Sequence, residues 1–349
     1  MFKFRNTLGC AALLTLCSLP AHATLNCSFT APTINFGAVD VLSGIYTQTT
    51  ASMIMTCTKR WADVGNTGNV CLFIGDGSGA DPVRGSRNTY APRFLVSGAN
   101  YAGFQIYTDP SYSTFWGTYA PNPSPQLISF TFAGGSRTYT APVVFYAQMA
   151  AISPALNGTT TLQSIVPGAY ASSFSGGHTY WASTLTTNQT VDAECNPRLY
   201  SASGNFPFSV SATVNANCLV NSVANINFGT QASIATNLQG STNLSVQCTR
   251  TTPYYIGLAP SNGSVTGAGV MSSVANPLNL DQVPYQLRQT AGMAGTIWGN
   301  TATSSSAGNG IGGTGTGVSA QSYTIYATVP SANYSPDNYK DTVTVTVNF

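Results

Sequence analysis

The sequence predicts an all-β protein made of two β-sandwich domains, and three observations support this fold class. Apolar and polar residues alternate in short runs, as they do in strands with one buried face. These runs cover residues 52–56, 127–132, 142–146, 222–228, 244–247, 323–329 and 342–349. Clusters of Gly, Pro, Asn and Ser separate them, and no apolar stripe of helical period accompanies them. The third observation is that the chain repeats itself.

The repeat relates the two halves motif by motif. Ile34-Asn35-Phe36-Gly37 matches Ile226-Asn227-Phe228-Gly229, Cys57-Thr58 matches Cys248-Thr249, Phe115-Trp116-Gly117 matches Ile297-Trp298-Gly299, and Gly168-Ala169-Tyr170 stands where Asp337-Asn338-Tyr339 does. Order and spacing hold across most of each half, which indicates a duplicated domain. The first half is enlarged by insertions at about 65–92, 118–140, 149–166 and 173–205. The Gly- and Ser-rich segment 304–317 is expected to form one long hairpin loop.

The N-terminus carries the pattern of a secretion signal. Lys3 and Arg5 precede an apolar run at 8–19, and Ala21-His22-Ala23 is a small-x-small cleavage site. The run is too short to be a transmembrane helix. We therefore expect residues 1–23 to be removed, a mature chain from Thr24, no other stretch apolar enough to span a bilayer, and export at least as far as the periplasm.

Charged residues make up 6% of the chain, well below the ~25% of ordinary soluble proteins. Without the signal, ten Lys and Arg (12 minus Lys3 and Arg5) face ten Asp and Glu. Binding to nucleic acid and electrostatic attachment to membranes are therefore disfavoured. Low charge of both signs suits a subunit that packs against others. An ordinary secreted β-domain rich in Ser, Thr and Asn would have much the same composition.

Eight cysteines become six when Cys10 and Cys17 leave with the signal, and an even number in an oxidising compartment indicates disulfides. Six cysteines allow fifteen pairings. The thirty-residue spacing occurs once in each half, which favours Cys27–Cys57 and Cys218–Cys248 and leaves Cys71–Cys195 as a third bridge. No CxxC pair accompanies them, so we expect no metal site and no cofactor.

Enzymatic activity is not expected. His178 is the only histidine of the mature chain, and it lies in a Gly-rich loop without a partner pattern for nucleophilic catalysis. The carboxylates of the first half are scattered, at Asp76, Asp81, Asp109, Asp192 and Glu194. A pair of the glycosidase kind stays open, because partners meet in three dimensions, but no pattern marks one.

Two predicted strands, one at the end of each half, are the most informative about function. The junction strand alternates between polar residues and the apolar Phe206, Phe208, Val210, Ala212 and Val214, and ends just before Cys218. The C-terminal strand alternates through Val343, Val345, Val347 and Phe349, and no residue follows to pair with its other edge. An open edge beside such a strand invites pairing with another chain.

The order of cysteine, Asn-Phe-Gly, Cys-Thr, Trp-Gly and a terminal Asp-Thr-Val-Thr-Val-Thr-Val resembles the spore coat protein U domain family. Both halves match, the second more closely. Secreted members of that family build archaic (Csu-type) chaperone–usher pili. The resemblance implies an immunoglobulin-like sandwich that lacks its last strand. A neighbouring subunit supplies this strand, or a periplasmic chaperone does so transiently. The junction strand resembles the donor strand of such pilins.

Applied to this chain, the resemblance predicts a tip adhesin that attaches cells to surfaces and supports biofilm formation. Residues 24–215 would be the adhesin domain, completed in cis by strand 206–214, and residues 216–349 an incomplete pilin domain. The chain would accept a strand along Val343, Val345, Val347 and Phe349 but have none to give. The expected partners are a periplasmic chaperone, an outer-membrane usher, the next pilin subunit and an abiotic or host surface, with the protein at the pilus tip on the cell surface.

The surface contacts are expected in apolar insertion loops of the first half. The candidate residues are Tyr119, Met149, Ile152, Leu156, Tyr180 and Trp181. Two alternatives stay open. The chain could be a structural pilin or spore-coat-like surface protein without specific binding, or a lectin-like adhesin that binds glycans.

Overall fold

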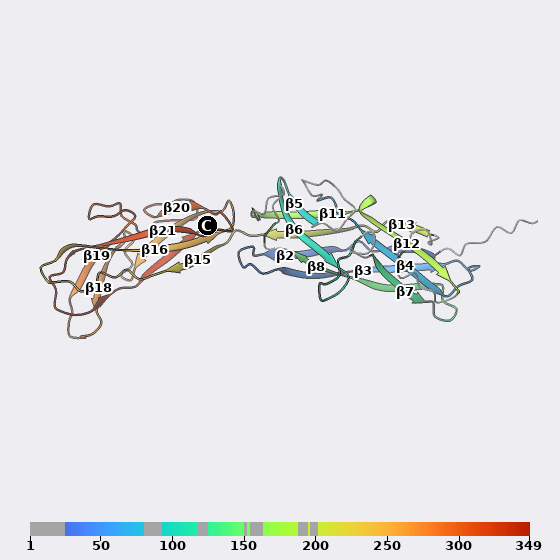
Figure 1. Cartoon of the computed structure of the whole chain (residues 1–349), viewed down its shortest axis with the longest axis horizontal. Coiled ribbons are helices and arrows are strands. Elements are labelled where there is room, and N and C mark those ends of the chain that lie inside the picture. The colour runs from blue at the N-terminus through green and yellow to red at the C-terminus, as the bar shows by residue number, and fades with distance from the viewer. Residues whose placement is uncertain are drawn as a thin grey trace, which may run out of the picture.

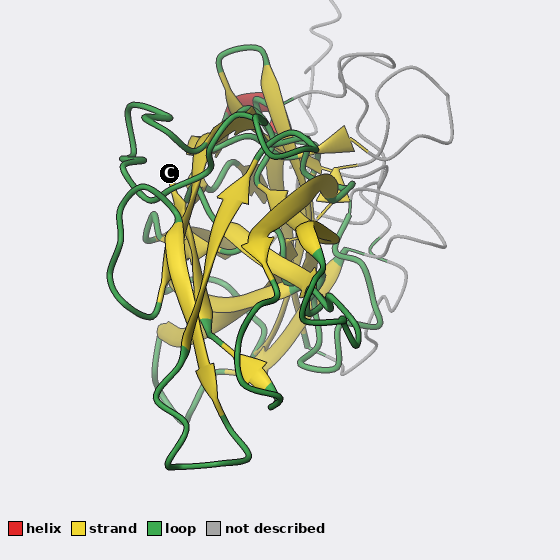
Figure 2. Cartoon of the chain, turned by 90° about the vertical axis from the view of Figure 1, so that its left-hand side faces the viewer, coloured by secondary structure: helices red, strands yellow, loops and turns green. Residues whose placement is uncertain are grey.

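The computed structural model describes residues 25–79, 93–117, 125–149, 152–153, 163–187, 195 and 202–349. The regular secondary structure of these residues is β-strand, apart from a single short 3₁₀ helix, η1 (Gly176–His178). Figure 2 shows the strands in yellow and that helix in red. Within the described ranges, no helix has the length and apolar character needed to cross a membrane.

The first half forms a sandwich of two main sheets. Its large sheet has the order β1-β3-β8-β6-β5-β11-β14-β2. These strands are β1 (Leu25–Phe29), β2 (Thr33–Val39), β3 (Thr47–Lys59), β5 (Arg93–Ser97), β6 (Asn100–Tyr107), β8 (Thr138–Met149), β11 (Gly168–Phe174) and β14 (Phe208–Val214). The facing sheet, β13-β12-β4-β7, contains β4 (Thr67–Ile74), β7 (Gln126–Thr131), β12 (Thr179–Thr186) and β13 (Ala202–Gly204). A separate pair joins β9 (Ile152–Ser153) to β10 (Gln163–Ser164).

The second half repeats this plan with fewer strands. Its large sheet has the order β15-β16-β21-β19-β18-β22, and a small sheet has the order β20-β17-β23. The strands are β15 (Cys218–Val223), β16 (Thr236–Cys248), β17 (Pro253–Pro260), β18 (Ala268–Ser273), β19 (Gln282–Arg288), β20 (Ile311–Thr314), β21 (Gln321–Ser331), β22 (Tyr339–Lys340) and β23 (Val343–Asn348). Figure 1 shows the two sandwiches end to end.

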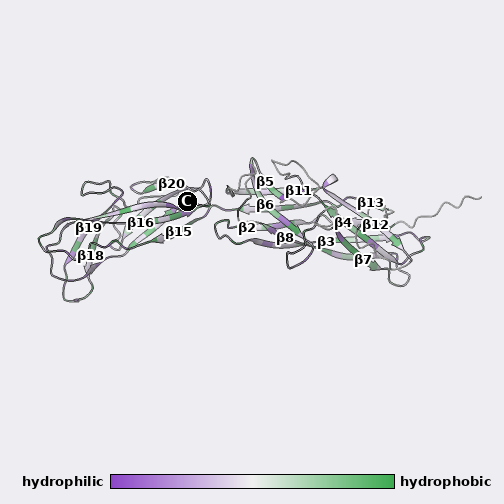
Figure 3. Cartoon of the chain, viewed as in Figure 1, coloured by the Kyte–Doolittle hydropathy of each residue, from purple (hydrophilic) through white to green (hydrophobic). Residues whose placement is uncertain are grey.

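Each sandwich has its own apolar core, and one buried tryptophan occupies the same place in both. Trp116 donates its indole N–H to the Leu72 carbonyl oxygen at 2.9 Å. Trp298 makes the same bond to Ile256 at 3.0 Å. Both side chains are fully buried. A buried indole needs such a partner, and the repeated bond confirms the duplication predicted from sequence. Figure 3 shows the hydrophobic residues gathered on the strands of both sandwiches.

Three disulfides join Cys27 to Cys57, Cys71 to Cys195, and Cys218 to Cys248, which are the predicted pairings. Cys27 and Cys57 lie opposite each other on β1 and β3, as Cys218 and Cys248 do on β15 and β16.

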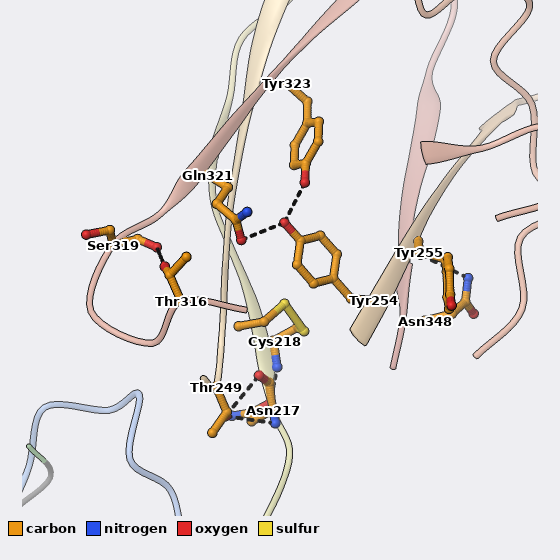
Figure 4. Close-up of a disulfide and its surroundings, with 11 residues drawn as sticks. Asn217, Cys218, Thr249, Tyr254, Tyr255, Thr316, Ser319, Gln321, Tyr323 and Asn348 are labelled. Carbon is orange, nitrogen blue, oxygen red and sulfur yellow. Dashed lines mark hydrogen bonds between the residues drawn. A yellow bond between two sulfur atoms is a disulfide. The ribbon is translucent and has the colours of Figure 1, made fainter. Parts of the chain in front are cut away.

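The connection between the sandwiches is short. β14 ends at Val214, and Asn217 is already fastened to the second sandwich. The Thr249 N–H donates to the Asn217 carbonyl oxygen at 2.9 Å, and the Asn217 N–H donates to the Thr249 hydroxyl at 3.1 Å, beside the Cys218–Cys248 disulfide (Figure 4). Residues 215 and 216 alone lie between these two anchored ends.

Two local predictions differ from the structure. The alternating run at 222–228 leaves the sheet after Val223, although it was expected to be a strand throughout. The segment at 304–317 contains β20, which pairs with β17, so it is not only a loop. A Cβ at Gly313 would collide with the side chains of Tyr254 and Tyr323, so glycine lets this strand lie against the core.

Candidate functional site: an open strand edge in the second sandwich

β14 occupies the gap between β11 and β2 in the first sandwich. It runs antiparallel to β11, with Val214 opposite Gly168 and Phe208 opposite Phe174. It runs parallel to β2, with Ser209 opposite Thr33. Both of its edges are therefore paired, and the segment adjoining the second sandwich completes the sheet of the first.

The apolar face of this segment lies in the core of the first sandwich. Phe206, Phe208, Val210, Ala212 and Val214 are each at most 4% exposed. Burial of a Val or Phe side chain contributes about 1.5–3 kcal/mol. The first sandwich therefore depends strongly on β14.

The second sandwich keeps the elements that flank this gap. Gly229 has φ +69°, as Gly37 does, and its N–H bonds to the Asn227 side-chain oxygen at 2.8 Å. The Gly37 N–H bonds to Asn35 in the same way, at 2.9 Å. A positive φ favours glycine, so the repeated Asn-x-Gly motif marks the same turn in both sandwiches.

A second repeated contact marks the start of the other flank. The Tyr170 hydroxyl donates to the carbonyl oxygen of Val166, four residues earlier, at 2.8 Å. The Tyr339 hydroxyl donates to that of Ser335 at 2.7 Å. Tyr339 therefore corresponds to Tyr170, which makes Asp337 the counterpart of Gly168.

The strand that would lie between these flanks is missing from the described part of the second sandwich. β22, the counterpart of β11, pairs there with β18 alone, with Ser272 opposite Lys340 and Ser273 opposite Tyr339. β23 pairs with β17 alone, from Pro260 opposite Val343 to Tyr255 opposite Asn348. Residues 225–231, the counterpart of β2, belong to no strand. Because no neighbouring strand shares backbone hydrogen bonds with this segment, it does not form a strand. This explains why the strand predicted at 222–228 ends early.

The apolar side chains around the gap are correspondingly less covered. Ile34 and Phe36 are 0% and 6% exposed, whereas their counterparts Ile226 and Phe228 are only partly buried. Val343, Val345 and Val347 are also partly buried against the second core, and Phe349 is 47% exposed. We call this region the open groove: residues 225–231, β22 and β23.

The chemistry of the open groove suits strand addition. A free strand edge offers backbone N–H and C=O groups, and alternating apolar side chains offer specificity. Asp341, between β22 and β23, accepts a hydrogen bond from the Tyr285 hydroxyl at 2.6 Å, and burial of this tyrosine raises the pKa of its hydroxyl. The described residues contain no group of three or more His, Cys, Asp or Glu side chains able to hold a metal.

The candidate loop residues of the first half do not form one exposed cluster. Met149 and Trp181 were expected on exposed loops, and this was wrong because both are strand residues with buried side chains, 0% and 4% exposed. Met149 continues the inward-facing series Val143, Phe145 and Ala147 of β8, so the insertion begins after it. Trp181 lies in β12, with its ring centroid 6.0 Å from that of Phe29.

The other candidates are only partly placed. Tyr180 is 39% exposed, with its ring centroid 5.7 Å from that of Phe73. Ile152 lies in β9, of which only the backbone is described. Tyr119 and Leu156 lie outside the described residues.

Sequence reasoning missed the most deeply buried charged residue of the described part, Arg93, which is 0% exposed. Its guanidinium donates to the carbonyl oxygens of Gly75 at 2.7 Å, Trp116 at 2.6 Å and Ile74 at 3.1 Å, and also bonds to Gln105. Complete burial lowers the pKa of Arg93 to about 10, and Asp76 acts in the opposite direction. The group ties β5 to neighbouring loops and is structural. A lone Arg directly before the apolar run Phe94-Leu95-Val96 was the available signal.

The Spore Coat Protein U domain model matches residues 12–163 and 204–346. Among solved structures, the chain is similar to the CsuC–CsuE chaperone–tip adhesion subunit pre-assembly complex from archaic chaperone–usher Csu pili of Acinetobacter baumannii. There the identity is 16% and the TM-score 0.49, and the match covers 93% of this chain and 100% of that one.

The CupB6 tip adhesin from Pseudomonas aeruginosa matches at 12% identity and a TM-score of 0.33, covering 93% of this chain and 94% of that one. CfaE, the adhesive subunit of CFA/I fimbria of enterotoxigenic Escherichia coli, matches at 8% identity and a TM-score of 0.33, covering 91% and 92%. No curated protein sequence matches the chain.

Proposed function

Since the chain belongs to the Spore Coat Protein U domain family, we propose that it is the tip adhesin of a secreted chaperone–usher pilus. Residues 24–215 are the adhesin domain, and residues 216–349 are the pilin domain that joins the fibre. One observation carries this proposal: β14 fills the gap between β11 and β2 in the first sandwich, and the matching gap of the second is the open groove.

The first sandwich is completed in cis. β14 directly precedes Cys218, where a donor strand of the family would stand, and it is paired on both edges within its own chain. A strand used in this way is not available to another subunit. This is the reason for a place at the tip, where a subunit accepts a strand and gives none.

The second sandwich is completed in trans. The open groove takes a strand that runs antiparallel to residues 337–343, the counterpart of β11, and parallel to residues 225–231, as β14 runs between β11 and β2. In the periplasm a chaperone supplies that strand, and in the pilus, after passage through an outer-membrane usher, the next pilin supplies it. Strand addition gives affinity through the backbone and specificity through alternate side chains.

The adhesive role belongs to the first sandwich, which carries the insertions that the second lacks. Of the residues proposed for surface contact, Tyr180 has an exposed side chain in the structure. Through such side chains the adhesin attaches cells to surfaces and supports biofilm growth.

The strand-acceptor role is tested with the mature full chain and a donor peptide, defined as a synthetic peptide of the N-terminal strand of the pilin encoded beside it. The chain should bind the donor peptide one to one, and the binding of a dye that reports exposed apolar surface should fall. Val345→Asp in the groove should abolish both effects. Val318→Asp is the matched control, because Val318 is 48% exposed and belongs to none of the groove elements. Equal binding by both variants would contradict the proposal.

The tip position is tested by immunogold labelling of assembled pili with an antibody to the first sandwich. Gold at the fibre ends supports a tip adhesin. Gold along the whole shaft would show a structural pilin instead. Inhibition of attachment by one particular glycan would show a lectin-like adhesin.

A further inference from the structure

The loop between β18 and β19 displays two leucines to solvent. Leu278 and Leu280 are each 87% exposed. The loop spans the eight residues 274–281, whereas the equivalent connection in the first sandwich, between β5 and β6, has two residues and turns at Gly98 with φ +58°. The second sandwich is smaller elsewhere but longer here. β18 and β19 stand toward the end of the second sandwich that faces away from the first (Figure 1).

This loop is fastened in place by side-chain hydrogen bonds. The Asn279 amide donates to the Asp337 carboxylate at 3.0 Å and to the Tyr339 hydroxyl at 2.8 Å. The Asp281 carboxylate accepts the Ser335 N–H at 2.8 Å. Leu278 and Leu280 are the sequence neighbours of Asn279, whose side chain is fixed by these hydrogen bonds. Their own side chains are exposed to solvent. Large exposed apolar side chains in such a setting indicate an interaction surface.

β14 shows where the domain that donates a strand must lie relative to the domain that accepts it. In the first sandwich, β14 ends at Val214, opposite Gly168 of β11 and Val39 of β2. The second sandwich, which adjoins this strand in the chain, begins at Cys218, only four residues after Val214. The body of the donating domain therefore starts directly beside the end of the strand.

The same geometry applies to the open groove. The counterparts of Gly168 and Val39 are Asp337 and Gln231, by the matched tyrosines and the matched glycines described above. A strand bound in the same direction ends between Asp337 and Gln231, and the body of its subunit begins there. Asp337 is the residue that holds the leucine loop through Asn279.

Gln231 is followed three residues later by a third exposed apolar residue, Ile234, which is 89% exposed. Its turn is also fixed, because the Ala332 N–H donates to the Ala235 carbonyl oxygen at 2.9 Å. Exposed apolar side chains thus stand on both sides of the place where the donated strand leaves the groove.

We propose that Leu278, Leu280 and Ile234 form a second contact with the body of the strand-donating pilin, separate from the strand itself. This inference rests on the proposed strand-acceptor function. The contact holds the pilin against the outer end of the second sandwich, so that the tip joint resists bending as well as extraction of the strand.

The test compares the donor peptide with the whole pilin that carries the same strand. The full chain is studied as wild type, as Leu278→Asp/Leu280→Asp, and as the control Val318→Asp. All three substituted side chains are exposed, so the variants should fold. We expect the donor peptide to bind all forms equally. We expect the whole pilin to form a joint of fixed angle with wild type and control, measured by small-angle scattering, and a joint of broad angular spread with the leucine variant.

A photo-crosslinking amino acid at position 278 provides the second readout. It should give a product with the whole pilin that maps outside the donor strand, and none with the donor peptide. An unchanged joint in the leucine variant, or a crosslink to the chaperone or to a second copy of this chain in place of the pilin, would overturn the second contact. Loss of donor-peptide binding to wild type would instead overturn the strand-acceptor function.

Discussion

The ring of Phe208 lies flat against that of Phe174, with centroids 4.3 Å apart and 9° between the planes. The two residues are opposite each other on β14 and β11. β14 is therefore bound to its neighbour by side chains as well as by the backbone ladder, and the first sandwich depends on a segment that adjoins the second.

Phe208→Ala should destabilise the first sandwich by about 3–5 kcal/mol, because it removes a buried ring and leaves a cavity. The measurement is chemical denaturation of the full chain followed by tryptophan fluorescence. Ser209→Ala is the matched control. Its hydroxyl bonds to that of Thr33 at 3.0 Å in an exposed position, so the change should be within ~1 kcal/mol. Equal effects would mean that β14 is not part of the core.

Arg93→Met should also destabilise the first sandwich, by at least ~3 kcal/mol, because three backbone carbonyl oxygens lose their charged donor. Arg93→Lys should recover only part of this loss, since an ammonium cannot reproduce the planar fork. Thermal and denaturant unfolding of both variants would measure the difference. The exposed Arg137→Met should stay within ~0.5 kcal/mol of wild type. A neutral Arg93→Met would contradict the structural role.

The leucine loop should loosen at low pH. Hydrogen bonds from Ser273 and Asn279 lower the pKa of the Asp337 carboxyl to about 2, against ~3.9 for an unperturbed aspartate. A carboxyl group whose pKa is lowered by folding stabilises the folded state at pH values above its unfolded pKa. This stabilisation is lost as the pH falls toward the folded pKa of about 2. Amide exchange at Leu278 and Asp281 should therefore be faster in Asp337→Ala than in wild type at pH 6, and the difference should shrink as pH falls and vanish below pH 2. A constant difference would exclude this carboxylate as the anchor.

Gly313→Ala should destabilise the second sandwich, because the new methyl group would collide with the side chains of Tyr254 and Tyr323. A loss of several degrees in thermal midpoint is expected. Gly134→Ala is the comparison, since a Cβ there meets no atom within 4 Å. If both variants melt alike, β20 does not lie against the core as described.

Much of this architecture was predictable from local pattern. The alternation of apolar and polar residues predicted β14 and β23. The internal repeat showed that Trp116 and Trp298 are equivalent, and the cysteine spacing predicted the disulfide pairings. Met149 and Trp181 were misplaced because sequence comparison locates an insertion only approximately, and strand ends near its borders are read as loop. Residues 224–228 alternate like a strand but have no partner, and only the assembled sheet shows that. β20 was missed because its glycines carry no apolar signal.

The sequence predicted that the C-terminal strand has an open edge, but not which residues lie on the other side of the open groove. The sequence places Val343, Val345 and Val347 on one face of a strand, yet the second flank, Ile226 and Phe228, comes from more than a hundred residues earlier. Its role appears only when the two sandwiches are compared. The loop of Leu278 and Leu280 gave no pattern, because its arrangement depends on hydrogen bonds to Asp337 and Tyr339.

The measurement that tests the central claim most directly is amide hydrogen exchange on the mature full chain, with and without the donor peptide. Without peptide, residues 33–39 and 168–174 should be protected and residues 225–231 should exchange rapidly. Adding the peptide should slow exchange in 225–231 and in 337–343, and leave 33–39 and 168–174 unchanged. Protection of 225–231 before any peptide is added, or peptide-induced protection of 168–174, would contradict a first sandwich closed by β14 and a second left open.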